Sequence, residues 1–463
     1  MGVEKFLELE SMPYPRERSQ FASPRSDFVS SDDSGGGDCD GTYPMSTKET
    51  ATPATRAQSL TIVAAASVLM CLGMGMRQSF GLFMVPITGD LGLTVSDFTF
   101  ALALQNMIWG ITQPFVGAIA DRFGMRIMLI FGSLCFAAGL LVTVLATNAL
   151  SLLLGMGVLI GTSLSCTASN LSLTATSRVV SPARRSATLG MVAGIGSFGT
   201  FLVAPMAQKL IAGHNWHVAI YAFIALAIVM LPAAFLTGGV DKVADQRGSG
   251  RGGAAPETFR EVLRAAANHR GYVTMATAIF VCGLQLIFLT THLPTYLALC
   301  GADPMLGAEA LSTIAIFNVG GCYLLGWLGG KYPKHILLGL VYVLRSIFIA
   351  IYFLSPATPT TTLVFAAVMG LMWLGVIPLT QGLVIQMFGL RYLATLSGIM
   401  FFTHQVGSFL GAWGGGLIYD HFGSYDHAWQ LGVVIGLIAG MAQMLTDDKP
   451  GRNKRKRLEP ATA

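Results

Sequence analysis

About twelve apolar segments of membrane-spanning length run along this chain of 463 residues, and they constrain its fold more than any other feature. A helix needs ~20 mostly apolar residues to cross the hydrocarbon of a bilayer. Charged residues make up 11% of the chain, whereas about a quarter of a soluble protein is charged. We therefore expect an all-α integral membrane protein, and a soluble enzyme, a disordered scaffold and a secreted disulfide module are excluded. The expected spans are residues 60–86, 97–119, 125–146, 150–173, 187–211, 216–237, 272–298, 308–328, 336–354, 361–388, 393–418 and 428–445.

Polar segments divide these spans into two groups of six and bound them at both ends. The tails are poor in apolar residues, which favours disorder, and the apolar residues of the connector share one helical face. The expected organisation is a disordered tail over 1–56, a six-helix half over 57–237, a connector with an interfacial helix over 238–270, a second six-helix half over 271–446 and a basic tail over 447–463.

Lys and Arg residues alternate between the two sides of the membrane. The connections after even-numbered spans hold about 14 of them, and those after odd-numbered spans hold about one, Lys209. Because cytoplasmic loops are enriched in Lys and Arg, we expect both termini in the cytoplasm. The asymmetry also supports twelve spans, since a miscounted pair would scramble it.

Several landmarks recur with an offset of about 210 residues. Gly117 and Gly326 each open a turn after the second span of their half, and residues 196–198 and 407–409 both read Gly-Ser-Phe. Such a period predicts two pseudo-symmetric halves related about an axis along the membrane normal. Folds of this kind place a solute site between the halves, near the middle of the bilayer.

The connection between spans 2 and 3 carries a distinctive motif. Residues 117–126 read Gly-Ala-Ile-Ala-Asp-Arg-Phe-Gly-Met-Arg, which resembles the G-x-x-x-D-R-x-G-x-[RK] signature of the major facilitator superfamily. The resemblance covers about residues 58–446 and implies that family's fold and its alternating access. In the family this charged cluster latches one access state, so the resemblance implies a gating role for Asp121, Arg122 and Arg126.

Two further segments resemble the monocarboxylate porter branch of that family. Residues 182–194 resemble the basic, glycine-containing entry to its fifth span, where we expect Arg184 and Arg185 to contribute to gating. Residues 77–83 resemble the end of its first span, where the branch often carries a cation. The chain departs from the branch at Asn318, which stands where the branch has an acid in its eighth span.

Two cations are expected deep in the bilayer, where each charge costs about 2.5–3.5 kcal/mol on insertion scales. They are Arg77 in span 1 and Arg345 near the centre of span 9, with no acid expected at similar depth. This imbalance indicates that an anion completes the site, since a planar guanidinium suits a carboxylate. The alternative is that Arg77 extends toward the membrane surface and Arg345 bonds backbone carbonyls. Gln285, the repeat mate of Arg77, is expected beside the cavity on the corresponding helix.

Buried polar side chains are the remaining candidates. His292 and His404 can titrate near neutral pH, so either could carry a coupled proton, with hydrogen-bonded packing as the alternative. Further polar candidates, for which a structural role is the alternative, are Asn106, Gln113, Asn170, Asn318 and Gln381.

These features predict a secondary active transporter that moves a small organic anion, such as a monocarboxylate, together with a proton. One alternative is a proton-driven exporter of a hydrophobic metabolite or drug, with an apolar cavity around Trp373. Another is a membrane nutrient sensor of the same fold that signals through its N-terminal tail. An enzyme is not expected, because the chain has neither a cluster of His or acidic ligands nor a phosphate-binding loop. We also expect no cofactor, metal ion or nucleic-acid partner, and a monomer in the lipid bilayer of the plasma membrane.

Overall fold

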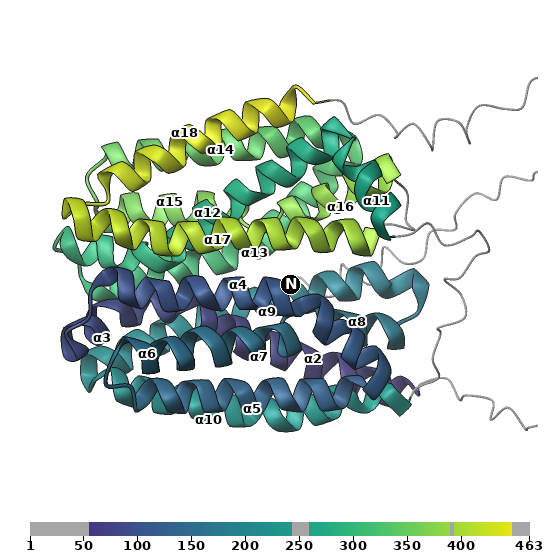
Figure 1. Ribbon diagram of the computed structural model, residues 1–463, viewed down its shortest axis with the longest axis horizontal. Helices are drawn as coiled ribbons and strands as arrows, with labels where there is room; N and C mark the ends of the chain where they lie inside the picture. Colours follow the sequence, from purple (N-terminus) through teal and green to yellow (C-terminus); the bar gives the residue numbers. More distant parts are fainter. Residues whose placement is uncertain (1–54, 243–258, 389–392, 447–463) are drawn as a thin grey trace, which may run out of the picture. The chain divides into compact units, whose positions relative to one another are not determined.

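The computed structural model describes residues 55–242, 259–388 and 393–446, which belong to one compact unit, Ala51–Ala463. The expected tails and most of the connector lie outside the described residues. Every element of regular structure in the described part is a helix, and the long helices run side by side in one bundle (Figure 1).

The first half contains six helical rods, some of them built from consecutive shorter elements. In chain order they are α2 (Arg56–Gln78) with η2 (Phe80–Phe83) and α3 (Met84–Leu91); α4 (Val95–Phe123); α5 (Met125–Val144); α6 (Ala149–Leu152) with the π-helical η3 (Leu153–Leu159), α7 (Ile160–Thr167) and α8 (Ser169–Val179); α9 (Pro182–Gly213); and α10 (Trp216–Thr237) with η4 (Gly238–Lys242).

The second half repeats this arrangement after a short helix in the connector. Its elements are α11 (Phe259–Ala267), α12 (Arg270–Leu299), α13 (Pro304–Lys331), α14 (Lys334–Leu354), α15 (Pro359–Leu371) with α16 (Val376–Phe388), α17 (Leu393–Phe422) and α18 (Asp426–Met444).

Ten of the rods in the described part are long and apolar enough to cross a membrane. The remaining two, α4 and α17, have 29 and 30 residues, which is more than the ~20 that a span requires. They are less apolar because polar side chains such as Asn106 and Gln405 face the protein interior, where both are buried. Each of the twelve expected spans therefore corresponds to one helical rod, built from one helix or from consecutive shorter ones.

The two halves are built from matching helix pairs. In the first half α2 packs on α9 and α5 on α10, while in the second half α12 packs on α17 and α14 on α18. Gly199 lies so close to the carbonyl oxygen of Cys71 that a Cβ atom would overlap it, and Gly407 approaches the carbonyl of Phe280 in the same way. Each half has its own large apolar core. The predicted pair of pseudo-symmetric six-helix halves is confirmed.

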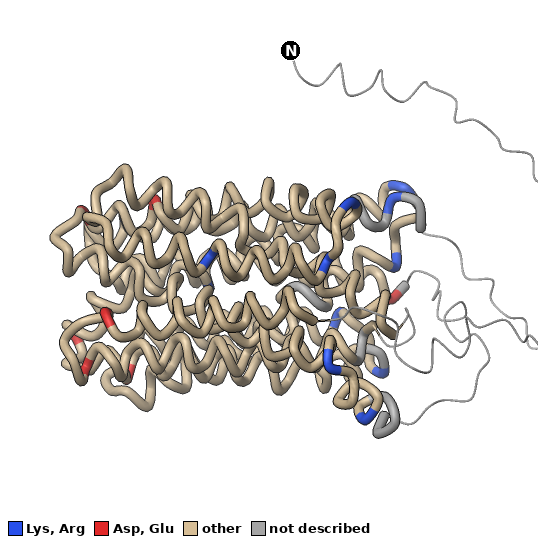
Figure 2. Tube along the Cα trace, turned by 90° about the horizontal axis from the view of Figure 1, so that it is seen from above, with Lys and Arg blue, Asp and Glu red and all other residues tan. Residues whose placement is uncertain are grey.

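Most of the charged residues lie at the two ends of the bundle (Figure 2). The end rich in Lys and Arg is termed the basic end, and it includes Arg122, Arg126, Arg184, Lys331 and Lys334 at helix termini. The opposite, acidic end includes Asp90, Asp97, Asp303, Asp420 and Asp426. The cytoplasmic position of the basic end stays a prediction from the charge pattern.

The tenth span, expected over 361–388, contains a break that was not predicted. Helix α15 ends at Leu371, and α16 begins at Val376. A break of this kind frees backbone N–H and C=O groups from their helical partners. Such groups need other partners inside a membrane, where water cannot satisfy them.

Candidate functional site

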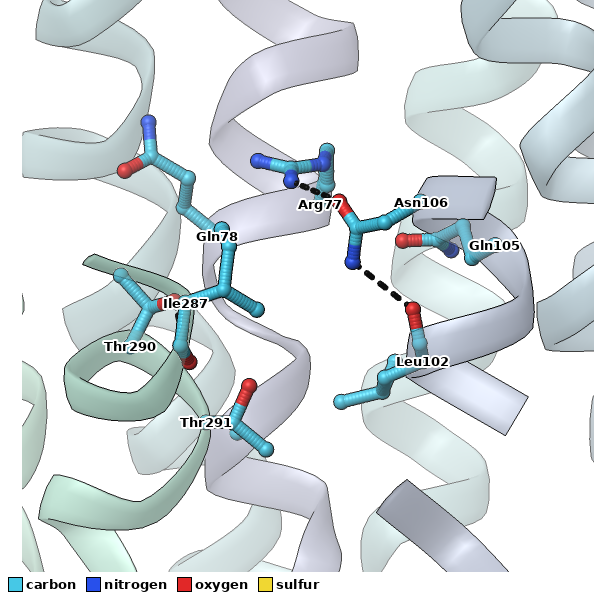
Figure 3. Close-up of a pocket in the computed structure, with 9 residues that line it drawn as sticks. Arg77, Gln78, Leu102, Gln105, Asn106, Ile287, Thr290 and Thr291 are labelled. Carbon is cyan, nitrogen blue, oxygen red and sulfur yellow. Dashed lines mark hydrogen bonds between the residues drawn. The ribbon is translucent and has the colours of Figure 1, made fainter. Parts of the chain in front are cut away.

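A small pocket lies between the two halves (Figure 3). Its walls come from α2, η2 and α4 of the first half and from α12 of the second half. The lining residues are Arg77, Gln78, Gly81, Leu102, Gln105, Asn106, Ile287, Thr290 and Thr291. The empty space within the pocket is about 260 Å³, which includes space that is open to its surroundings.

Arg77 provides the positive charge of this pocket. Its Nη2 donates a hydrogen bond to Asn106 Oδ1 on α4, with 2.5 Å between the two atoms (Figure 3). Its Cζ lies 5.0 Å from the ring centroid of Trp109, one turn further along α4. Among the lining residues that the structure describes, none is Asp or Glu. The guanidinium thus has neutral neighbours at the pocket wall.

Two threonines of α12 form the opposite wall, in the second half. Thr290 and Thr291 carry hydroxyl groups that can donate to or accept from a polar solute. Gln105 also lines the pocket, but its Nε2 donates to the Met156 carbonyl at 2.9 Å, which anchors the amide within the first half. The pocket therefore combines one cation, several neutral hydrogen-bonding groups and two aliphatic side chains.

The two halves are in contact from this pocket to the acidic end. Gly81 lies against the carbonyl oxygen of Thr290, so closely that a Cβ atom would overlap it. At the acidic end of α4, the backbone N–H of Ser96 donates to Asp420 Oδ2 of α17 at 2.8 Å. Both contacts join residues of different halves, so they hold the acidic side of the pocket closed.

Arg345 lies in the interior of the second half and is fully buried. Its Nη2 donates to the carbonyl oxygens of Met372 and Trp373, and its Nη1 lies 3.3 Å from Cys282 Sγ. These carbonyls lie just beyond the C-terminus of α15, where the helix dipole favours a positive charge. Such contacts match the structural alternative for this residue. Substrate binding by Arg345 stays a prediction, and its surroundings do not support it.

Asn318 connects the tenth span with the other half. Its Oδ1 accepts the N–H of Leu374 at 2.9 Å, inside the break between α15 and α16. Its Nδ2 donates to Ser197 Oγ of α9 at 2.8 Å. Asn318 is thus placed between the halves, although it is not among the residues that line the pocket.

Gln285 points into its own half, so its expected position beside the cavity is wrong. Its Nε2 donates to Ser346 Oγ of α14 at 3.1 Å and to the Gly432 carbonyl of α18 at 3.0 Å. The offsets between repeated motifs differ by about three residues, and each residue rotates a helix position by ~100°. An offset alone therefore cannot specify the face on which a repeat mate lies.

The two buried histidines have different surroundings. His292 is fully buried, with Nε2 2.8 Å from the Ala412 carbonyl and Nδ1 3.1 Å from the Tyr425 hydroxyl, all in the second half. His404 is half-buried on α17, where Nδ1 lies 3.2 Å from Gln405 Oε1. Gln405 packs against Gly110 of α4, so this part of α17 faces the other half. A proton role for either histidine stays a prediction.

Trp373 is buried in the core of the second half, with 4% of its surface exposed. Trp373 is not among the residues that line the pocket beside Arg77. The exporter hypothesis therefore gains no support from this pocket.

A family model covers most of these helices. The model of the Major Facilitator Superfamily matches residues 63–412. The chain belongs to the major facilitator superfamily. Because this family and the relatives below are transporters, the protein is a membrane transporter and not an enzyme.

Among superfamily members, several known proteins are similar to this one. Monocarboxylate transporter 13 of Bos taurus is 25% identical over 390 residues, which cover 83% of this chain and 88% of that protein. The oxalate:formate antiporter of Oxalobacter formigenes is 35% identical over 98 residues, covering 20% and 23% of the two chains. A crystal structure of the nucleoside transporter NupG has a TM-score of 0.67 at 14% identity, covering 84% and 99%. The last similarity concerns the fold alone.

The family's signature cluster lies at the basic end, between α4 and α5. The side chain of Asp121 lies outside the described part, and Arg122 is exposed, with its Cζ 5.3 Å from the Phe123 ring centroid. The guanidinium of Arg126 lies over the ring of Phe235 on α10, with 4.4 Å between Cζ and the centroid. The gating role of these residues stays a prediction from the family.

An acid that the sequence analysis did not single out lies beside this superfamily signature. Asp241 of η4 accepts the backbone N–H groups of Met125 and Arg126, each at 2.9 Å, and so caps the start of α5. At the entry to α9, Arg184 is exposed, and the side chain of Arg185 lies outside the described part. Arg184 is not among the described residues that line the pocket between the halves of this transporter.

The sequence analysis did not single out some of the polar residues that line the pocket. They are Gln78, Gln105, Thr290 and Thr291. Each lies within two positions of a residue that was singled out, so adjacency along the chain was the available signal. Periodicity gave no reason to choose them, because a hydroxyl or amide can equally bond within its own helix.

Proposed function

We propose that this transporter moves a small organic anion, with monocarboxylates as the first class to test. The observation that carries the proposal is the position of Arg77 on the wall of a pocket between the halves, beside a neutral amide. A carboxylate can accept two parallel hydrogen bonds from one guanidinium, and a site of low dielectric strengthens this attraction. The threonine hydroxyls on α12 suit a carboxylate that also carries polar groups.

The similar proteins provide independent support for this class of solute. The names of two relatives contain monocarboxylate in one case and oxalate and formate in the other. All of these are small carboxylates. Because the identities are only 25% over most of the chain and 35% over a short part, the names support the class and not one solute.

Transport would occur by alternating access, with the two halves rocking about the pocket. Contacts close the acidic side in this structure, and the same contacts must open when the acidic end admits a solute. We place the basic end and both termini in the cytoplasm, in a monomer of the plasma membrane. The charged residues at 121–126 and 184–185 would act as gating residues at that end.

A proton is the proposed coupling ion. An anion that crosses together with a proton moves no net charge, so a membrane potential does not oppose its uptake. His404 is the better placed of the two candidate proton carriers, because its helix faces the other half. In the described part of the chain, the hydrogen-bond partners of His292 both lie in its own half.

The test is uptake of radiolabelled formate, acetate, lactate and pyruvate by the purified protein in liposomes. We expect uptake that an inward proton gradient stimulates and a protonophore abolishes. Arg77→Ala should abolish it, whereas Arg77→Lys, which keeps the charge but loses the planar fork, should retain part of it. Unchanged uptake by Arg77→Ala would refute the proposed site, and no uptake of any carboxylate by the natural protein would refute the solute class.

A further inference from the structure

The hydrogen-bond partner of Arg77 is an uncharged side chain where a charged one of the same shape would fit. Asn106 is 2% exposed, and its Oδ1 accepts from Arg77 Nη2 at 2.5 Å. An aspartate has nearly the same size and would form an ion pair with the guanidinium. Buried cations in membranes commonly pair with acids, so the amide at this position calls for an explanation.

A second hydrogen bond determines which way this amide points. Asn106 Nδ2 donates to the carbonyl oxygen of Leu102 at 2.8 Å, one turn earlier on α4 (Figure 3). The reverse orientation would place an amide oxygen against this carbonyl and an NH₂ group against the guanidinium. Both contacts would be repulsive, so the amide presents its oxygen to Arg77.

The other neighbours of the guanidinium leave its charge intact as well. Trp109 presents its ring to Arg77, and its Nε1 donates to Gln113 Oε1 at 2.8 Å, which holds the indole in place. The attraction of a ring for a cation stabilises the charge without neutralising it. Within the described part of the chain, Arg77 Nε is buried and has no hydrogen-bond partner. The group therefore has both a full positive charge and unused donors.

We infer that Asn106 is a positioning residue that orients Arg77 without neutralising its charge. In this way it makes the pocket select anions over neutral solutes of similar size. The inference rests on the proposed function, because it concerns the same pocket. An acid at position 106 would compete with a carboxylate solute for the guanidinium. At such short separations the attraction between opposite charges is large enough to lower anion affinity by about 100-fold.

Two substitutions at this position separate the effect on the charge of Arg77 from the effect on its orientation. Asn106→Asp keeps the shape and neutralises Arg77, and we expect the KM for carboxylates to rise about 100-fold. Asn106→Leu removes the acceptor but leaves the charge, and we expect a rise of less than about tenfold. In both variants kcat should change little, since the residue acts on binding.

The experiment measures KM and kcat for formate, acetate, lactate and pyruvate in liposomes that contain the purified full chain. Uptake of lactamide, a neutral analogue of lactate, reports the selectivity for anions. Asn106→Asp should reduce the difference between the uptake of lactate and the uptake of lactamide. Gln443→Glu serves as the matched control, because it changes a buried amide of α18 that does not line the pocket to an acid. The KM, kcat and selectivity of this control should equal those of the natural protein.

Should Asn106→Asp fail to fold, Gln78→Glu places a carboxylate on the same pocket wall from α2 and should also raise KM. A folded acid variant with the KM values of the natural protein would overturn the inference and leave the proposed function standing. A natural protein that transports none of the four carboxylates would overturn the proposed function, and this inference with it. A rise in KM as large for Asn106→Leu as for Asn106→Asp would show that charge is not what Asn106 preserves.

Discussion

Arg345 and Asn318 hydrogen-bond opposite sides of one break in the tenth span. Arg345 Nη2 donates to the carbonyls of Met372 and Trp373, just beyond the end of α15, and Asn318 Oδ1 accepts the N–H of Leu374 before α16. Unpaired backbone groups are costly in a membrane interior. Two side chains from α14 and α13 therefore replace the helical bonds that the break removes.

We predict that Arg345→Met destabilises the protein, because it leaves the carbonyls of Met372 and Trp373 without their donor. An unsatisfied buried polar group costs about 1–3 kcal/mol, so the loss should lower the melting temperature of the detergent-purified protein measurably. Arg345→Lys keeps the charge but not the planar fork of the guanidinium. Its melting temperature should lie between those of the natural protein and Arg345→Met. A stable Arg345→Met variant with a raised KM for carboxylates would instead favour the substrate-binding role predicted from the sequence.

Asn318 hydrogen-bonds both the break in the tenth span and the other half, and two variants distinguish these two contacts. Ser197→Ala removes only the bond between the halves, whereas Asn318→Leu also leaves the N–H of Leu374 unsatisfied. We therefore expect Asn318→Leu to lower the melting temperature more, by an amount that corresponds to about 1–3 kcal/mol. Equal effects of the two variants would mean that Asn318 does not stabilise the break.

Hydropathy and an internal repeat were sufficient to predict the fold, for a physical reason. A membrane span must be long and apolar, so it is visible along the chain, and a repeated motif shows two halves without any knowledge of contacts. The break at residues 372–375 was not predicted, because the segment around it is as apolar as a continuous span. The side chains that hydrogen-bond the freed backbone groups, Arg345 and Asn318, come from other helices.

The pocket was predicted only in part, because depth along a span does not determine the face on which a side chain lies. Arg77 and Arg345 both lie deep in their spans, yet one lines the space between the halves and the other bonds carbonyls within a half. Gln285 also turned out to face its own half. The polarity of these residues predicted that each has a specific role inside the membrane. Tertiary contacts determine whether that role is to line the pocket or to bond groups within one half.

Gly81 gives a test of the closed acidic side. A side chain here would overlap the carbonyl of Thr290 in the other half, so Gly81→Val should disfavour the conformation seen in this structure. We expect faster labelling of a Thr295→Cys reporter by a membrane-impermeant maleimide from the acidic side, in a background without other cysteines. Gly89→Val is the matched control, since the space around Gly89 is open. Equal labelling of the two variants would contradict the assignment of this contact as part of the closure.

Asp420 offers a second, electrostatic test of the same closure. Its carboxylate accepts the N–H of Ser96 at the start of α4, where the positive end of the helix dipole favours an anion. Such a contact contributes about 0.5–1 kcal/mol at an exposed site, so Asp420→Ala should shift the equilibrium toward opening by about twofold to fivefold. Asp420→Asn keeps an acceptor oxygen without the charge, and it should produce a smaller shift.

Asp426→Ala is the control. It removes a charge from the same end, where the backbone N–H of Asp426 bonds Ser424, and should leave access to the pocket unchanged. The Thr295→Cys reporter measures all three variants, and equal labelling after the loss of either acid would mean that general charge at this end, and not the bond to Ser96, controls opening.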